Sequence, residues 1–372
     1  MFRKVFVPIV LFCLSAVPVL AEQAPARPDY VKARVLAVEL FNNELAGAQF
    51  NEISQQVRLR IESGKFSGGE ITVDHMASGM MGPDMMLKPG DRVMLYVDEY
   101  PLPAESPDGA PIFHVADYYR AAPVYWLAFL YAVLLVILGG RKGIKSLISL
   151  VLTIALIFLV LFPLTLKGFN PLLVSVSLAA FLSLMVFRII GGRSIKSLSA
   201  ALGTLIGVTF AGILSYIFGR AAHLTGLSSE ESRILLYSLD LKMDYQGLLF
   251  GSILIGALGA IMDVGMSIAS AIAEVKRVHP EADMKLLFTS GINVGRDVMG
   301  TMSNTLILAY TGSALPLLLL LMANQVGLSK IINLEMITVE AVRALAGSIG
   351  LILCIPLTAM ISAYLYTRGQ RD

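Results

Sequence analysis

Residues 146–166 read SLISLVLTIALIFLVLFPLTL, an apolar run without a single charged side chain. A helical run of about 20 apolar residues is long enough to cross the hydrocarbon core of a bilayer. Similar runs recur after residue 122, and from them we predict about seven membrane-spanning helices. Their ranges are 122–139, 146–166, 170–190, 198–219, 246–272, 303–323 and 345–366. The sequence therefore predicts an α-helical polytopic membrane bundle.

The composition supports a membrane protein. Of 372 residues, 56% are hydrophobic and only 15% are charged, whereas a soluble domain carries about 25% charged residues. The mean hydropathy is +0.73. The net charge of +2 is too small to suggest a nucleic-acid partner, so we read the basic residues for membrane topology instead.

The first residues resemble an export signal. Arg3 and Lys4 precede the apolar run 5–19, and Ala21 ends a small-residue cleavage site. We predict a signal peptide over residues 1–21; an uncleaved anchor helix is the alternative. If the leader is removed, Cys13 is lost and Cys354 is the only cysteine left, so no intrachain disulfide can form.

Residues 22–120 have a different pattern from the rest of the chain. Apolar and polar residues alternate over 31–38, 56–62 and 92–97, with glycine-containing turns between these runs. Such alternation is typical of short β-strands. We predict a small extracytoplasmic β domain of the OB or SH3-like barrel kind. A binding platform, a spacer and a partner-docking domain all fit this pattern.

A methionine-rich stretch in this domain offers soft sulfur ligands outside the cytoplasm. It contains His75, Met76, Met80, Met81, Met85 and Met86. Thioethers suit Cu(I), but the same residues also fit a flexible loop whose methionines pack on the barrel or on the membrane surface. We favour the loop, and we predict no resident cofactor.

Two nearly identical segments join predicted helices. GGRKGIKSL at 139–147 returns as GGRSIKSL at 191–198. Residues 121–219 therefore read as two duplicated hairpins, followed by three further spans in residues 220–372, although convergence on a common turn sequence is an alternative. These turns and the segment around 276–285 are rich in Lys and Arg, which indicates that they and the C-terminus face the cytoplasm.

Two segments between the later spans are too polar to cross a membrane. Residues 228–246 and 328–344 predict interfacial helices on the outer side. At the end of the second, Glu340 and Arg343 are spaced i, i+3. They are expected to form an ion pair; a gate is the alternative.

The most informative residues are polar and lie at membrane depth. The fifth span carries Asp263, Ser267 and Ser270 at helical spacing, and the next segment carries Asn293, Arg296, Asp297 and Asn304. An Asp at the bilayer centre costs about 2.5–3.5 kcal/mol on insertion scales, so it marks a functional site by default. We predict that Asp263 carries a proton or another cation. The alternative is a structural role, in which Asp263 pairs with Arg296 or accepts local hydrogen bonds.

Glycines accompany both polar stripes. They allow helices to approach closely, and they also suit a broken or re-entrant segment. We expect such a break at residues 291–295.

These patterns favour a transporter or permease component, driven by an ion gradient and with an unknown substrate. No HExxH, GxSxG or P-loop pattern occurs, so we expect no enzyme activity and no ATP use. The alternative is a membrane scaffold or assembly partner whose β domain docks another envelope protein. The expected partners are the lipid bilayer and a second copy or another membrane subunit.

Three motifs carry a resemblance to a known family. They are GALGAIMDV at 256–264, GRDVMGTMSNT at 295–305 and VRALAGSIG at 342–350. In these motifs, and along nearly the whole chain, the protein resembles the YibE/F family of bacterial multi-pass membrane proteins. The resemblance implies a protein of the bacterial cytoplasmic membrane with a small extracytoplasmic β domain before its spans.

Overall fold

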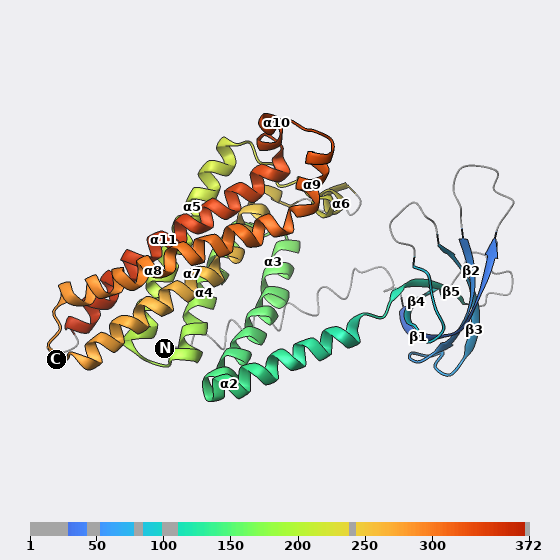
Figure 1. Cartoon of the computed structure of the whole chain (residues 1–372), viewed down its shortest axis with the longest axis horizontal. Coiled ribbons are helices and arrows are strands. Elements are labelled where there is room, and N and C mark those ends of the chain that lie inside the picture. The colour runs from blue at the N-terminus through green and yellow to red at the C-terminus, as the bar shows by residue number, and fades with distance from the viewer. Residues whose placement is uncertain (1–28, 43–52, 78–84, 99–110, 238–242, 369–372) are drawn as a thin grey trace. The chain divides into compact units, whose positions relative to one another are not determined.

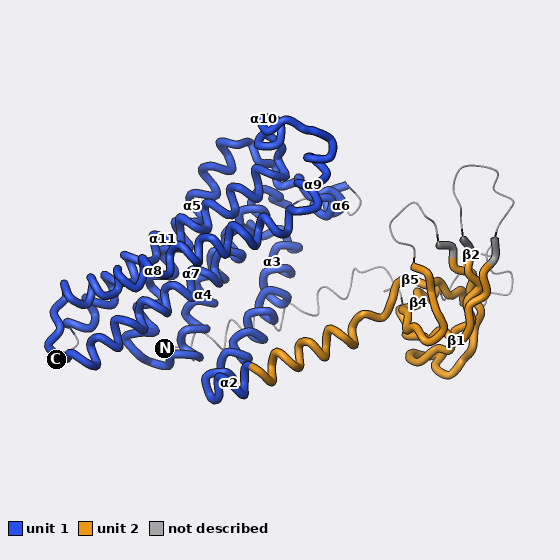
Figure 2. Tube along the Cα trace, viewed as in Figure 1, with its two compact units in different colours: residues 1–18, 135–372 blue, residues 19–134 orange. Residues whose placement is uncertain are grey.

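The computed structural model describes residues 29–42, 53–77, 85–98, 111–237 and 243–368. The predicted signal peptide, Met80 and Met81 lie outside these residues. The chain forms two compact units that divide between Leu134 and Leu135 (Figure 2). Each is described by itself below.

The N-terminal unit contains one five-stranded antiparallel sheet (Figure 1). Its strands are β1 (Asp29–Asn42), β2 (Ile53–Ile61), β3 (Glu70–Ala77), β4 (Arg92–Asp98) and β5 (Ile112–Tyr118). They lie in the order β3-β2-β1-β4-β5, and all neighbours pair antiparallel. The edge strands β3 and β5 contact each other, so the sheet curls into a half-barrel around a single core.

The alternation in the sequence explains this core. Val31, Ala33 and Val35 of β1 are buried, while the residues between them are exposed. The strands predicted over 31–38, 56–62 and 92–97 correspond to β1, β2 and β4. The sequence did not predict β3 and β5. β5 lies at an edge and buries no residue fully, so burial imposes little alternation on its sequence.

The helical unit begins within one long apolar segment. α2 (Ala121–Leu156), the π-helix η2 (Ile157–Leu161) and α3 (Phe162–Leu166) follow one another without a gap. Together they span 46 residues, about twice the length that a bilayer needs. Gly140 bends α2 because its backbone angles, φ 52° and ψ −132°, are not helical. The first two predicted spans lie on either side of this glycine.

Eight more helices complete the described part of the unit. They are α4 (Pro171–Gly191), α5 (Ile195–Ala221), α6 (Glu230–Tyr237), α7 (Tyr245–Val278), α8 (Met284–Ser313), α9 (Leu315–Ala323), α10 (Leu328–Ile332) and α11 (Glu335–Arg368). α5, α7 and α11 pack against one another, with α4 and α8 alongside (Figure 1). Gly207 of α5 and Gly350 of α11 allow a close approach of the two backbones, because a Cβ added to Gly350 would lie 2.7 Å from the Gly207 carbonyl oxygen.

The number of candidate spans is smaller than predicted. Among the described residues, five helices are long and apolar enough to cross a membrane, and a sixth arises if the bent pair α8 and α9 counts as one. The sequence predicts about seven, because it assigns two spans to the single segment 121–166. The polar segment predicted over 328–344 is also divided, because its second half forms the first turns of α11.

The predicted break at residues 291–295 is wrong. α8 is continuous there, and the bend of 59° lies between α8 and α9. Gly291 and Gly295 serve close packing instead: added Cβ atoms would lie 2.6 Å from an atom of Ile272 and 2.2 Å from an atom of Ile355. Pro316, in the first turn of α9, begins the new helix at the observed bend.

The two copies of the GGR motif share a backbone conformation. Gly192 has φ 71° and ψ −158°, close to the angles of Gly140. The second glycine of each copy thus takes the left-handed region that side chains disfavour. The repeat in the sequence is therefore also a repeat in the turn geometry.

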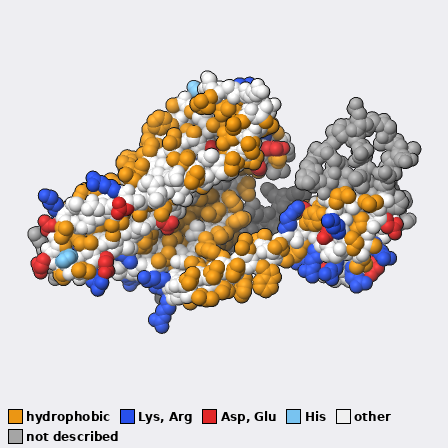
Figure 3. Space-filling model, in the orientation of Figure 1, with side chains coloured by type: hydrophobic (Ala, Val, Ile, Leu, Met, Phe, Trp, Pro, Cys, Tyr) orange, Lys and Arg blue, Asp and Glu red, His pale blue; other side chains and the backbone are white. Residues whose placement is uncertain are grey.

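Charged residues gather toward one end of the helical unit. On the face shown in Figure 3, hydrophobic and uncharged atoms cover most of this unit, and charged side chains concentrate where α11 ends. A hydrogen bond of 2.7 Å from Ser362 to Ser199 places the end of α11 beside the start of α5. The last turn of α7 carries Lys276 and Arg277, and that of α11 carries Arg368.

Candidate functional site

Asp263 lies near the middle of α7, a helix that is firmly placed at both ends. Asp244 caps its N-terminus by accepting a hydrogen bond of 2.7 Å from the Gly247 N–H. After its C-terminus, Lys276 Nζ donates to the carbonyl oxygens of Pro280 and Ala282, at 2.6 and 3.0 Å. These contacts fix the turn into α8.

The side chain of Asp263 is exposed, although its neighbours in the helix are buried. Ile261, Val264 and Ile268 face the core and are at most 1% exposed, whereas Asp263 and Ser267 lie on the opposite face. Within the described residues the Asp263 carboxyl has no hydrogen bond and no ion pair, and so it does not pair with Arg296. The Ser267 hydroxyl donates instead to the backbone oxygen of Asp263, at 2.8 Å.

The polar stripe of α8 is exposed as well. Asn293, Arg296, Asp297 and Asn304 are all exposed, whereas Gly291 and Gly295 are buried. No hydrogen bond or ion pair among the described residues links this stripe to that of α7. The polar stripes of α7 and α8 are therefore both exposed, and their side chains do not hydrogen-bond to each other.

Two packing contacts establish the register between these antiparallel helices. A Cβ added to Gly256 of α7 would lie 2.8 Å from the hydroxyl of Tyr310, and one added to Gly291 of α8 would meet Ile272. Both helices rise equally per residue, so counting from either contact places Asp263 at the depth of residues 300–303 of α8. The same count places Asp297 at the depth of Ser267.

Two glycines leave space around Asp263. Gly259 lies one turn before it on α7, and Gly300 lies at its depth on α8. An added Cβ at either glycine would meet nothing within 4 Å. The Asp263 carboxyl is therefore reachable from outside the helix pair, and solvent or an ion can approach it.

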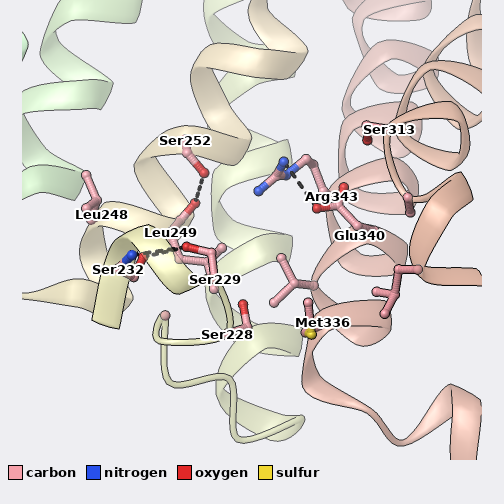
Figure 4. Close-up of a pocket in the computed structure, with 14 residues that line it drawn as sticks. Ser228, Ser229, Ser232, Leu248, Leu249, Ser252, Ser313, Met336, Glu340 and Arg343 are labelled. Carbon is pink, nitrogen blue, oxygen red and sulfur yellow. Dashed lines mark hydrogen bonds and ion pairs between the residues drawn. The ribbon is translucent and has the colours of Figure 1, made fainter. Parts of the chain in front are cut away.

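A second polar site lies at the opposite end of the unit from the basic turns. Arg343 Nη1 lies 3.4 Å from Glu340 Oε1, and each side chain is 25% exposed. The guanidinium carbon of Arg343 also lies 5.7 Å from the ring centroid of Tyr310. Both charged residues line a cavity of about 420 Å³ (Figure 4).

Other residues of this cavity are not predicted by the sequence. Ser232, Ser252 and Ser313 contribute hydroxyls to its walls, and Tyr310 lies beside Arg343. The sequence places Ser228 only at the start of a polar segment. These residues come from segments far apart in the chain, so no local pattern signals them.

The methionine-rich stretch is only partly described. The His75 ring nitrogen Nε2 lies 3.0 Å from the carbonyl oxygen of Met85. Met86 is exposed, and the side chain of Met76 lies outside the described set. Among the described residues, no group of three or more His, Cys, Asp or Glu side chains is placed to hold a metal ion. Copper binding by the methionines stays the alternative to the predicted loop.

Five described helices long and apolar enough to cross a bilayer are what the class of multi-pass membrane proteins contains. The sequence profile of the YibE/F-like protein family matches residues 127–368. Because this match covers more than half of the chain, the protein belongs to that family, as its motifs indicated. Comparison with curated proteins and with solved structures gives no match.

Proposed function

We propose that the protein is a transporter or permease component that carries a proton or another cation past Asp263. One observation supports the proposal. The Asp263 carboxyl lies exposed in the middle of an apolar helix and has no partner among the described residues. Lipid beside a charged carboxyl would cost several kcal/mol. A water-filled path along the α7 and α8 faces avoids that cost.

The neighbouring residues suit such a path. Ser267, Ser270, Asn293 and Asn304 supply hydroxyl and amide groups that solvate an ion, and glycines 259 and 300 leave room for it. Asp297 and Arg296 lie closer to the basic end of the unit, where they tune the charge at the mouth of the path. Transport here is driven by an ion gradient rather than by catalysis or ATP.

The proposed topology has seven crossings. The segment 121–166 crosses twice, turning at Gly140, and α8 with α9 crosses once. The β domain then faces the extracytoplasmic side, following a cleaved signal peptide, and the C-terminus faces the cytoplasm of a bacterium. The basic ends of α4, α7 and α11 support this orientation, since basic loops stay inside.

Proton flux in proteoliposomes tests the proposal. The full-length protein is reconstituted with a pH-sensitive dye inside, and a pH gradient is imposed while the membrane potential is clamped. We expect wild type to dissipate the gradient faster than protein-free vesicles. The Asp263→Asn variant should dissipate the gradient only at the protein-free rate, because a side-chain amide does not take up and release a proton as a carboxyl does.

A matched variant controls for loss of charge alone. Glu281 lies exposed in the turn between α7 and α8, and Glu281→Gln should retain the wild-type rate. Equal rates for wild-type and protein-free vesicles would refute proton carriage. So would an Asp263→Asn variant that conducts like wild type.

A second candidate function is a scaffold whose β domain docks another envelope protein. It is favoured by a row of aromatic side chains on the outer face of the sheet: Tyr30 lies 5.9 Å from Tyr96, and Tyr96 stacks on His114 at 6.2 Å. Tyr30 is half exposed. Under this alternative, cells tolerate Asp263→Asn, whereas the double variant Tyr30→Ala and His114→Ala fails to complement a deletion strain.

A further inference from the structure

The cavity beside Arg343 lies where four parts of the chain converge. The loop before α6, the start of α7, the junction of α8 with α9 and the first turns of α11 form its walls (Figure 4). Its volume of about 420 Å³ falls within the ~300–1,000 Å³ range of small-molecule sites. It is separate from Asp263, which does not line it.

The wall formed by residues 224–229 is held in place by side chains from other helices. Gln246 Nε2 donates to the Leu224 carbonyl at 2.6 Å. Glu335 Oε1 accepts from the N–H and the hydroxyl of Thr225, at 2.6 and 2.8 Å. At Gly226, φ is +80° and an added Cβ would lie 2.2 Å from a backbone oxygen. The cavity is therefore pre-formed, which lowers the entropy cost of binding.

The charged pair in the cavity is incompletely satisfied. The ion pair is long, with 3.4 Å between Arg343 Nη1 and Glu340 Oε1. Arg343 Nε and Glu340 Oε2 are both buried, and neither has a hydrogen-bond partner among the described residues. Such unpaired buried atoms cost free energy and weaken the pair, and the exposed quarter of each side chain is the part that a ligand can reach. One cationic and one anionic group are thus available side by side.

The hydroxyls of the cavity complete the pattern. Ser252 donates to the Leu249 carbonyl and Ser313 to the Tyr310 carbonyl, at 2.7 and 2.8 Å. Their protons are used within the protein, so their oxygens keep lone pairs that can accept from a ligand. Such acceptors suit an ammonium group, as the Glu340 carboxylate does. Apolar residues, among them three leucines and Met336, line the remaining wall.

From this arrangement we infer that the cavity binds a small zwitterionic solute of the α-amino acid class. Arg343 binds its carboxylate, and Glu340 with the serine oxygens binds its ammonium group. A zwitterion matches a site that offers both charges. An anion alone would be repelled by Glu340, and a cation alone would be repelled by Arg343. The inference names the substrate class of the transporter and in that respect rests on the proposed function.

Thermal unfolding of the full-length protein in detergent tests the inference. The twenty common amino acids are added one at a time, with sodium acetate and methylammonium chloride as single-charge probes. A ligand that binds only the folded state raises the midpoint. We expect at least one amino acid to raise it and neither single-charge probe to do so. The responding amino acid is then titrated by calorimetry.

Variants assign the binding to this cavity. Arg343→Gln and Glu340→Gln should each weaken the affinity by about tenfold or more, since each removes a charge-assisted hydrogen bond. Met336→Trp fills the cavity while keeping both charged residues and should also abolish binding. Lys330→Gln removes an exposed charge of α10 outside the cavity and should bind like wild type.

The outcomes separate this inference from the proposed function. Asp263→Asn should still bind the amino acid, although it carries no protons. The inference fails if no amino acid raises the midpoint, if acetate alone raises it equally, or if the cavity variants bind as wild type does. Proton flux that persists without any amino-acid binding would leave the transporter proposal standing and remove this one.

Discussion

Replacing Asp263 with leucine distinguishes a carboxyl that carries ions from one that holds helices together. Within the described residues the Asp263 side chain has no partner, and the hydrogen bond from Ser267 goes to its backbone oxygen, which the substitution keeps. Replacing the carboxyl by an apolar side chain therefore removes no hydrogen bond and no ion pair of the described residues. Removing an Asp from membrane depth recovers up to about 3 kcal/mol if lipid touches that face. We expect the free energy of unfolding to stay unchanged or to rise by up to about this amount.

The measurement is unfolding in mixed micelles by titration with a denaturing detergent, followed by far-ultraviolet circular dichroism. Ser362→Ala provides the scale. It removes the buried hydrogen bond of 2.7 Å between α11 and α5 and should lower the free energy of unfolding by about 0.5–1.5 kcal/mol.

A structural role for Asp263 predicts the opposite sign. Breaking a buried ion pair costs about 3–5 kcal/mol. If Asp263→Leu destabilises the protein more than Ser362→Ala does, the carboxyl is structural and the argument from its missing partners is refuted. Loss of proton flux at full stability, in contrast, is the signature of a carrier.

Two further predictions concern packing. Gly350→Ala should lower the free energy of unfolding by about 1–3 kcal/mol, because its Cβ would lie 2.7 Å from the Gly207 oxygen; Gly259→Ala, with open space around it, should be neutral or stabilising by up to about 1 kcal/mol in the same titration. In the β domain, Gln55→Ala should cost about 1–3 kcal/mol, since the buried amide binds both the N–H and the carbonyl of Leu87, at 2.9 and 3.3 Å. Gln56→Ala, which removes an exposed contact with Asp74, should change the midpoint of thermal unfolding of the full-length protein little. If Gly350→Ala and Gly259→Ala had equal effects, the packing argument would be contradicted. If Gln55→Ala and Gln56→Ala had equal effects, the argument from the buried hydrogen bonds would be contradicted.

Much of the fold could be predicted because it depends on local patterns. Hydropathy located the two halves of segment 121–166 and the helices α4, α5, α7 and α11, since a span must be apolar along its whole length. The span predicted over 303–323 is wrong in its bounds, because it covers only the end of α8 and all of α9, with the bend between them. Alternation located β1, β2 and β4, since the half-barrel buries one face of each strand. The glycine at the second position of both GGR motifs was visible as a repeat, and its shared positive φ explains why glycine is used there.

Other features depend on packing that no local pattern reveals. The glycines at 291 and 295 fit a break as well as a close packing contact, and only the positions of Ile272 and Ile355 decide between the two. The bend lies instead between α8 and α9. Likewise, the spacing of Glu340 and Arg343 predicted an ion pair, but the cavity around it needs residues from four separate segments.

Local sequence patterns were enough to predict a β domain followed by long apolar helices, and to place Asp263 on the same helix face as Ser267. Periodicity places residues on a common face of a helix, but it does not say in which direction that face points. The packing of the helices shows that this face is exposed and that the Asp263 carboxyl has no partner among the described residues. This difference arises because backbone geometry alone defines a helix face, whereas the surroundings of that face depend on how α4, α5, α8 and α11 pack around α7.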